Sequence, residues 1–131
     1  MKYFLGVDFG GGSCKATLLS EQGRVVATAH KEYPTSRLIP GMAEQDPDDW
    51  YAATCCNVRT VLETAGVAAK DVAAIALDAA THTAVLCDED FRPLRPAIYW
   101  TDTRCQQEVA DLRAEMGDRI RALSYHSVDT I

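Results

Sequence analysis

The residues best suited to chemistry lie near the N-terminus, where an acidic residue precedes three consecutive glycines. The segment reads Asp8-Phe9-Gly10-Gly11-Gly12-Ser13-Cys14-Lys15. Because glycine accepts positive φ and lets a backbone approach a ligand closely, the N–H groups of such a turn can cradle phosphate oxygens. Ser13 would add a hydroxyl donor, Lys15 a compensating charge, and Asp8 a carboxylate that holds Mg²⁺ through its water shell. An ordinary glycine-rich hairpin turn is the alternative.

The spacing differs from that of two common nucleotide-binding loops. A Walker loop ends in Gly-Lys-Ser/Thr before a helix, whereas residues 15–20 (KATLLS) are typical of a strand. The pattern Gly-x-Gly-x-x-Gly does not fit the three consecutive glycines either.

A second polar segment, Glu44-Gln45-Asp46-Pro47, comes shortly before Trp50. Helix capping explains Asp46 and Pro47 fully. Glu44 and Gln45 have no such explanation, and we expect them to order a loop beside a binding pocket.

Two later segments suit recognition of a sugar. Thr81 and His82 follow an apolar run that ends at Asp78, and α/β proteins tend to place ligand groups after such a strand. A ring nitrogen of His82 could hydrogen-bond a sugar hydroxyl. A structural histidine and a satisfied strand-end acid at Asp78 are the alternatives.

The other segment is Trp100-Thr101-Asp102-Thr103-Arg104. An indole face stacks well on the C–H face of a sugar, and the Asp102 carboxylate could accept hydrogen bonds from two hydroxyls. Alternatively, Trp100 belongs to the core and Asp102 is the N-cap of a helix.

The elements around these segments predict an α/β fold. Strands over residues 3–8, 15–20 and 24–32 form an antiparallel meander, and a helix follows from the cap at Asp46 to Gly66. The apolar run 72–78 predicts a strand buried on both faces. Short strands are expected over 83–87 and 96–100, around a turn at 88–90, and a second helix from about Thr103 to Gly117. The order β-β-β-α-β-β-(β)-α predicts a mixed sheet covered by helices.

Composition limits the class of protein. The 131 residues suit one domain, and the net charge of −6 without a Lys/Arg cluster argues against a nucleic-acid partner. Neither a signal peptide nor an apolar run of membrane-spanning length is evident, so we expect a soluble, cytoplasmic protein. The cysteines are expected to be small buried residues in a reducing compartment rather than a zinc or disulfide framework. They are Cys14, Cys55, Cys56, Cys87 and Cys105.

Taken in order, the four segments resemble the start of the FGGY carbohydrate kinases, most closely the xylulokinase branch. The resemblance runs from Tyr3 to about Arg104. It implies an actin-like, ribonuclease-H-like fold with two domains around a cleft that holds ATP. The 131 residues would then be the N-terminal part of the first, sugar-binding domain, cut short and without the second domain.

The resemblance also implies roles for individual residues. Asp8 would be the acid beside Mg²⁺ and the phosphates, and Gly10 to Ser13 the turn that faces the transferred phosphoryl group. Thr81 and His82 fall where xylulokinases have a Met-His pair at the sugar site. Trp100 and Asp102 match a Trp-Asn-Asp-Gly-Arg segment beside that site.

The sequence departs from the family pattern in places that concern the sugar. The family's Gln-Met-His-Gly is replaced by Ala80-Thr81-His82-Thr83, and its Asn-Asp-Gly-Arg by Thr101-Asp102-Thr103-Arg104. The pocket is therefore altered, and D-xylulose does not follow as the substrate. An actin-like-fold ATPase that acts on no sugar and a non-catalytic binding module remain the alternatives.

Phosphoryl transfer needs a base that aligns the attacking hydroxyl, and in the family that aspartate lies far downstream of Ile131. We therefore expect no measurable kinase activity from the 131-residue chain by itself, and self-association through uncovered apolar surface. The assay is ADP release from ATP with pentuloses and hexuloses. Turnover by the purified chain would contradict this expectation.

Overall fold

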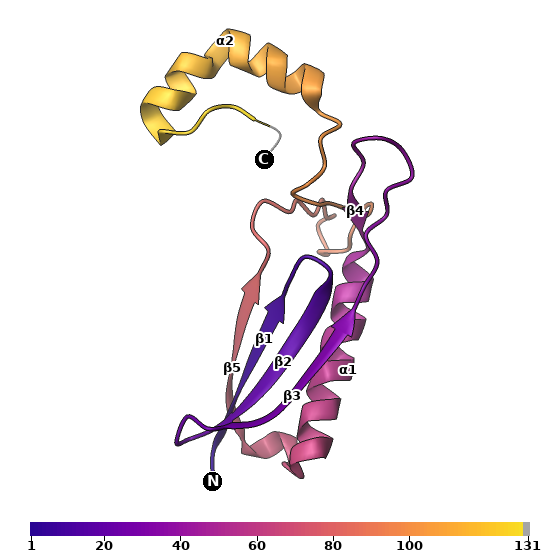
Figure 1. The fold of residues 1–131 in the computed structure, drawn as a ribbon, viewed down its shortest axis with the longest axis vertical. Helices are drawn as coiled ribbons and strands as arrows, with labels where there is room; N and C mark the ends of the chain where they lie inside the picture. Colours follow the sequence, from indigo (N-terminus) through magenta and orange to yellow (C-terminus); the bar gives the residue numbers. More distant parts are fainter. Residues whose placement is uncertain (130–131) are drawn as a thin grey trace. The chain divides into compact units, whose positions relative to one another are not determined.

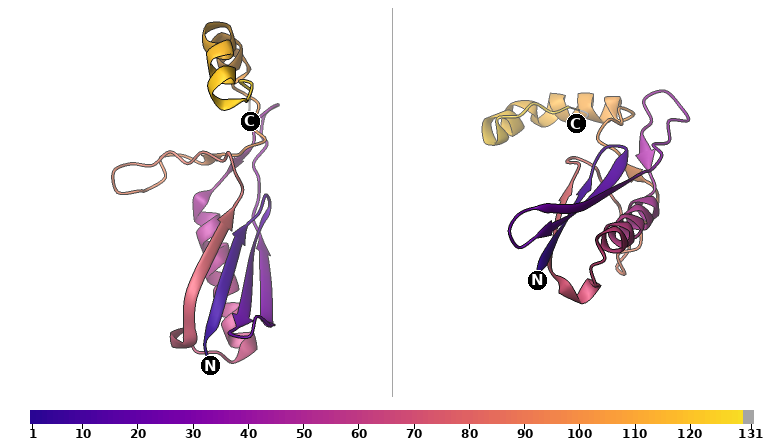
Figure 2. Two further views of the ribbon diagram at one scale, coloured as in Figure 1. Left: turned by 90° about the vertical axis from the view of Figure 1, so that its left-hand side faces the viewer. Right: turned by 60° about the horizontal axis from the view of Figure 1, so that its bottom comes forward.

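The computed structural model describes residues 1–129, which divide into two compact units (Figure 1; Figure 2). Unit 1 consists of Met1–Thr35 and Gln45–Thr81. Unit 2 consists of Ser36–Glu44 and the chain from His82 onward.

Unit 1 is a four-stranded mixed sheet with one long helix. β1 (Tyr3–Phe9), β2 (Ser13–Ser20) and β3 (Val25–Glu32) form the predicted antiparallel meander. β5 (Val72–Ala79) pairs with β1 in parallel, which gives the order β3-β2-β1-β5. α1 (Pro47–Ala65) and the 3₁₀ turn η1 (Ala69–Asp71) form the crossover between β3 and β5 (Figure 1). The mixed α/β sheet is thus confirmed.

α1 begins and ends where the local sequence predicts. The Asp46 side chain accepts a hydrogen bond from the N–H of Asp48 at 3.0 Å, and Pro47 occupies the first turn. Gly66 ends the helix with φ of 63°, a left-handed conformation that favours glycine. The helix covers one face of the sheet, where Val61 belongs to the same buried cluster as Leu5 and Leu18.

β5 corrects one prediction, because its residues are exposed rather than buried on both faces. Ile75 is 60% exposed and Leu77 69% exposed. β5 lies at the edge of the sheet with only β1 beside it, and α1 packs against β2 and β3 instead. An apolar sequence shows that a strand could be buried, but it does not show whether another element covers that strand.

Unit 2 departs more from the sequence-based prediction. Residues 83–87 form only isolated bridges, Ala84 to Ile98 and Cys87 to Pro93, and β6 is limited to Ala97–Ile98. β4 (Glu44–Gln45) lies where the chain passes back to unit 1. Within 83–95, backbone bonds such as that from the Leu94 N–H to the Leu86 carbonyl are few, and the Asp88 carboxylate also accepts from backbone N–H groups of the turn.

The second helix starts later and ends later than predicted. α2 is Gln106–Ser124, with Cys105 at the N-cap position and Gly117 inside the helix. Tyr125 ends it in a left-handed conformation with φ of 62°. Glycine inside a helix costs about 1 kcal/mol relative to alanine, and the helical residues on both sides of Gly117 carry the helix past it. Of the last residues, Thr130 and Ile131 lie outside the described part.

Two compositional predictions can be compared with the structure. All five cysteines are free, but only Cys14 is buried, so the expectation of buried cysteines is wrong for Cys56, Cys87 and Cys105, which are exposed. Among residues 1–129, no group of three or more cysteine, histidine or acidic side chains could hold a metal ion. No helix in this part is long and apolar enough to cross a membrane.

Candidate functional site

Hydrogen bonds to its carbonyl groups fix the glycine turn of unit 1, residues 10–12. The Tyr33 hydroxyl donates to the carbonyl oxygen of Gly10, and the Tyr33 N–H donates to that of Gly12 at 3.0 Å. The carbonyl oxygen of Gly11 accepts from Nε2 of Gln45 at 2.7 Å. Every carbonyl of the three glycines therefore has a partner from a distant part of unit 1.

The amide side of the same turn is largely open. The Gly10 N–H donates to the carbonyl of Ser13 at 2.9 Å, whereas the N–H groups of Gly11 and Gly12 donate to no other group of residues 1–129. Fixed carbonyls with open amides give the polarity that an anion site requires, so the turn fits a phosphate group.

The conformational reason expected for the glycines is wrong. The positive-φ glycines of the described chain are Gly23, Gly41 and Gly66, and none belongs to the turn. A Cβ added at Gly12 would meet nothing within 4 Å, and one at Gly10 would meet the Ser13 carbonyl at 3.2 Å. Glycine is favoured here because it has no side chain to cover the backbone N–H groups, not because it can adopt a positive φ.

Gln45 orders this turn, as expected of its segment. Its side chain is buried, and Nε2 also donates to Oγ1 of Thr35 at 2.7 Å. Nε1 of Trp50 donates to Oε1 of Gln45 at 3.0 Å. One amide group thus connects the glycine turn, the loop that follows β3 and the first turn of α1.

Asp8 lies at the end of β1 on the sheet face opposite α1. Its cross-strand neighbours are Lys15 on β2 and Asp78 on β5, and all three side chains are exposed and line an open hollow of about 350 Å³. Asp8 and Lys15 are thus cross-strand neighbours, and their roles stay predictions. The second carboxylate, Asp78, also accepts from the N–H of Ala79 at 2.9 Å.

Unit 2 brings three of the four predicted sugar residues together. His82, Trp100 and Asp102 line one cavity of about 350 Å³. Trp100 is 39% exposed and packs edge-to-face on the buried Tyr99, so it is not a core residue. The backbone of His82 adopts a left-handed conformation, with φ of 57°. Thr81 is exposed in the turn before it, and its role stays a prediction.

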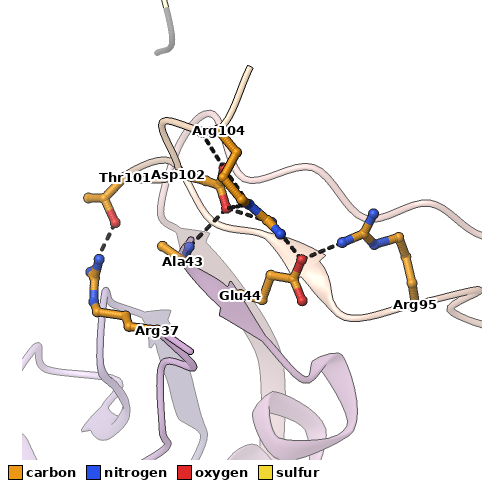
Figure 3. Close-up of polar contacts among 7 residues, drawn as sticks. All are labelled: Arg37, Ala43, Glu44, Arg95, Thr101, Asp102 and Arg104. Carbon is orange, nitrogen blue, oxygen red and sulfur yellow. Dashed lines mark hydrogen bonds and ion pairs between the residues drawn. The ribbon is translucent and has the colours of Figure 1, made fainter. Parts of the chain in front are cut away.

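Asp102 is not the N-cap of α2, which begins four residues later. Its Oδ2 accepts from the N–H of Ala43 at 2.8 Å, and its Oδ1 from the N–H of Arg104 at 3.0 Å. The Arg104 guanidinium binds both oxygens (Figure 3). These bonds, chiefly the one from the Arg104 side chain, lower the pKa of Asp102 to about 2 against the opposing effect of burial. Its contact with a sugar stays a prediction.

Glu44 completes this charge cluster. Its buried carboxylate accepts from Nη2 of Arg104 at 2.6 Å and from Nη2 of Arg95 (Figure 3). The hydrogen bond from Arg104 is the main cause of the lowered pKa of Glu44, and burial opposes it. The two carboxylates together raise the pKa of the Arg104 guanidinium.

Sequence reasoning did not single out Tyr33 or Arg95. Tyr33 directly follows the third predicted strand and carries no motif, although a tyrosine followed by Pro34 after a strand signals a fixed loop entry. Arg95 precedes a proline in a turn-rich segment, and its contact with Glu44 spans 51 residues. That the glycine turn and the sugar residues face one cleft stays a prediction, since they belong to different units.

Comparison with known proteins places these features in a family. Residues 3–129 match the N-terminal domain of the FGGY family of carbohydrate kinases. The xylulose kinase of Bacillus subtilis (strain 168) is 33% identical over 98% of this chain and 26% of its own length. The xylulose kinase of Escherichia coli (strain K12) is 38% identical over 86% of this chain and 23% of its own length.

A solved structure agrees in fold. The crystal structure of a xyloylose kinase from Brucella ovis superposes with a TM-score of 0.88 at 34% identity, over 98% of this chain and 26% of that one. The actin-like α/β fold predicted from the sequence is therefore confirmed. The chain spans about a quarter of the length of the relatives that it matches.

The hydrogen bonds of Gln45 generate a stability prediction. Gln45→Leu leaves the Gly11 carbonyl, the Thr35 hydroxyl and the Trp50 indole N–H without a partner. We expect it to lower the free energy of unfolding by about 2 kcal/mol, because three hydrogen bonds to partly buried groups are lost and each contributes about 1 kcal/mol. Urea unfolding followed by tryptophan fluorescence measures this. Gln22→Leu, at an exposed glutamine of the β2–β3 turn, is the matched control, and equal losses would contradict the role given to Gln45.

The lowered pKa of Asp102 predicts a pH dependence. A carboxyl whose pKa is lower in the folded chain than the usual 3.8 stabilises the fold above about pH 4 and loses that effect as the pH falls towards 2. Wild type should therefore melt at a higher temperature than Asp102→Asn at pH 7, and the difference should shrink between pH 4 and pH 2. A difference that does not depend on pH would show that the charge of Asp102 contributes nothing.

Proposed function

Because the chain belongs to the FGGY family of carbohydrate kinases, we propose that it is the sugar-binding and phosphoryl-receiving part of an ATP-dependent kinase. The protein would transfer the γ-phosphoryl group of ATP to a hydroxyl of a ketose or polyol, with the 131 residues as the N-terminal part of the first of two domains. The hydrogen bonding of the glycine turn supports the proposal. Its three carbonyl groups accept hydrogen bonds from Tyr33 and Gln45, while the N–H groups of Gly11 and Gly12 remain available to a ligand.

The glycine turn would bind the phosphoryl group that is transferred. Open backbone N–H groups offer donors whose positions are fixed before the ligand arrives, so charge that develops on the phosphoryl oxygens is stabilised without reorganisation. The Ser13 hydroxyl and the Lys15 ammonium group would add a donor and a positive charge. This means of binding needs no net positive charge on the protein, which carries −6.

Asp8 would hold Mg²⁺ through water. Its carboxylate is exposed at the turn end of β1, and Mg²⁺ favours carboxylate oxygens together with retained waters. When bound, Mg²⁺ neutralises charge on the phosphates. The neighbouring Lys15 keeps the hollow from holding two uncompensated carboxylates, Asp8 and Asp78.

The cavity of unit 2 would hold the sugar. The half-exposed Trp100 offers an apolar face to the C–H side of the sugar, and His82 offers a ring nitrogen to a hydroxyl. Asp102 already accepts from Ala43 and Arg104, so its part would be to shape the wall and to share a remaining lone pair with one hydroxyl.

The test uses the full-length protein with ATP, Mg²⁺ and a panel of ketoses and polyols that includes D-xylulose, with ADP release as the readout. We expect sugar-dependent ADP release that requires Mg²⁺. Asp8→Asn should lower kcat about 10²-fold, because it weakens the hold on the Mg²⁺ that stabilises negative charge in the transition state, and loss of one such stabilising group usually costs about that factor.

Glu21→Gln, an exposed carboxylate in the β2–β3 turn, is the control and should match wild type. ADP release that is independent of every sugar would favour an ATPase instead. A full-length protein that neither hydrolyses ATP nor binds a sugar would favour a binding module.

A further inference from the structure

We propose that Arg95, positioned by Glu44, determines specificity in the cavity lined by His82 and Trp100, and that this pair selects an uncharged sugar over a sugar acid. The inference rests on the proposed kinase function. It adds to that function a residue that no sequence motif indicates and a chemical class of substrate.

Arg95 is placed to donate hydrogen bonds into the cavity. It belongs to the cavity wall, and its side chain is 44% exposed. Its Nη2 donates to Glu44, and within residues 1–129 the structure gives its guanidinium no other partner. A guanidinium carries five N–H donors, so most of them remain available, and the oxygens of sugar hydroxyls are matching acceptors.

Glu44 acts through Arg95 and is therefore a positioning residue. Its side chain is only 8% exposed, and its Oε1 accepts from both Arg95 and Arg104 (Figure 3). Arg104 is fixed in turn by Asp102, whose other contact is the backbone N–H of Ala43. A buried carboxylate is tolerated only when it is paired and hydrogen-bonded, so the geometry of the whole cluster is constrained.

The charges of the cluster decide which ligand fits. An unpaired arginine would receive a carboxylate through two parallel hydrogen bonds. Here Arg95 and Arg104 are balanced by Glu44 and Asp102, and Glu108 adds a further negative charge to the cavity wall. No net positive charge is left to offset an anionic sugar, whereas the directed N–H groups of Arg95 still serve neutral hydroxyls.

Glu44→Gln in the full-length protein tests the inference. The measurements are KM for the neutral sugar that wild type phosphorylates fastest, KM for ATP, and Ki for D-gluconate as a competitor of that sugar. We expect KM for the sugar to rise about tenfold, the size of one charge-assisted hydrogen bond. KM for ATP should not change, and Ki for D-gluconate should fall, because one negative charge is gone.

A sugar KM that rises while the Ki for D-gluconate falls indicates that Glu44 positions Arg95. A merely structural role would weaken the binding of both ligands. Arg37→Gln is the matched control: Nη2 of Arg37 donates to Oγ1 of Thr101 at 3.0 Å, so it joins segments 36–44 and 97–104 without touching the charge cluster. Arg37→Gln should leave both the KM for the sugar and the Ki for D-gluconate unchanged. Equal effects of Glu44→Gln and Arg37→Gln would overturn the inference.

Arg95→Gln completes the experiment. The effect of Glu44→Gln on the sugar KM should disappear in this background, and additive effects would overturn the link between the two residues. If Glu44→Gln does not fold, Arg95→Gln alone decides, since an unchanged sugar KM would exclude Arg95 as a ligand.

The two proposals fail differently. A wild type that binds the neutral sugar by calorimetry without turnover overturns the kinase function, and the same variants then test the inference through Kd. A wild type that neither binds nor phosphorylates a sugar overturns both.

Discussion

Two adjacent buried residues, Glu44 and Gln45, make the hydrogen bonds on which the two candidate binding regions depend, Glu44 in unit 2 and Gln45 in unit 1. Gln45 has a donor end and an acceptor end, which suit a backbone carbonyl, a hydroxyl and an indole N–H together. Glu44 has only acceptors, which suit two guanidinium groups. Because a buried polar atom without a partner is costly, these bonds disfavour other positions of both side chains and of the groups that they contact.

The glycine turn illustrates how an acidic chain can bind an anion. The polarity of the turn comes from its backbone: Tyr33 and Gln45 occupy its carbonyls, so the exposed side of the turn is made of amide N–H groups. Such donors carry partial positive charge whatever the net charge of the protein. The anion site is therefore local, and Lys15 is a supplement to it rather than its origin.

Within segment 101–104, the two residues that depart from the family's pattern are Thr101 and Thr103, and neither belongs to the charge cluster. Asp102 and Arg104 keep their residue types, whereas Thr101 accepts from Arg37 and the N–H of Thr103 donates to the carbonyl of Gly41 at 2.8 Å. Gly41 has φ of 81°, and a Cβ there would meet Oγ1 of Thr103 at 3.0 Å. Altered threonines thus tie segments 36–44 and 97–104 together, while the paired charges that face the cavity stay the same.

The sequence by itself determined the elements whose signals are local. The meander follows from short apolar strands and tight turns, and α1 from Asp46, Pro47 and Gly66, because caps act over one helical turn. The order of the motifs also indicated the family. Only the tertiary structure decided that β5 is an exposed edge strand and that Arg95 meets Glu44. Those outcomes depend on partners tens of residues away or on a neighbouring element, and pattern and propensity in a short window carry no information about either.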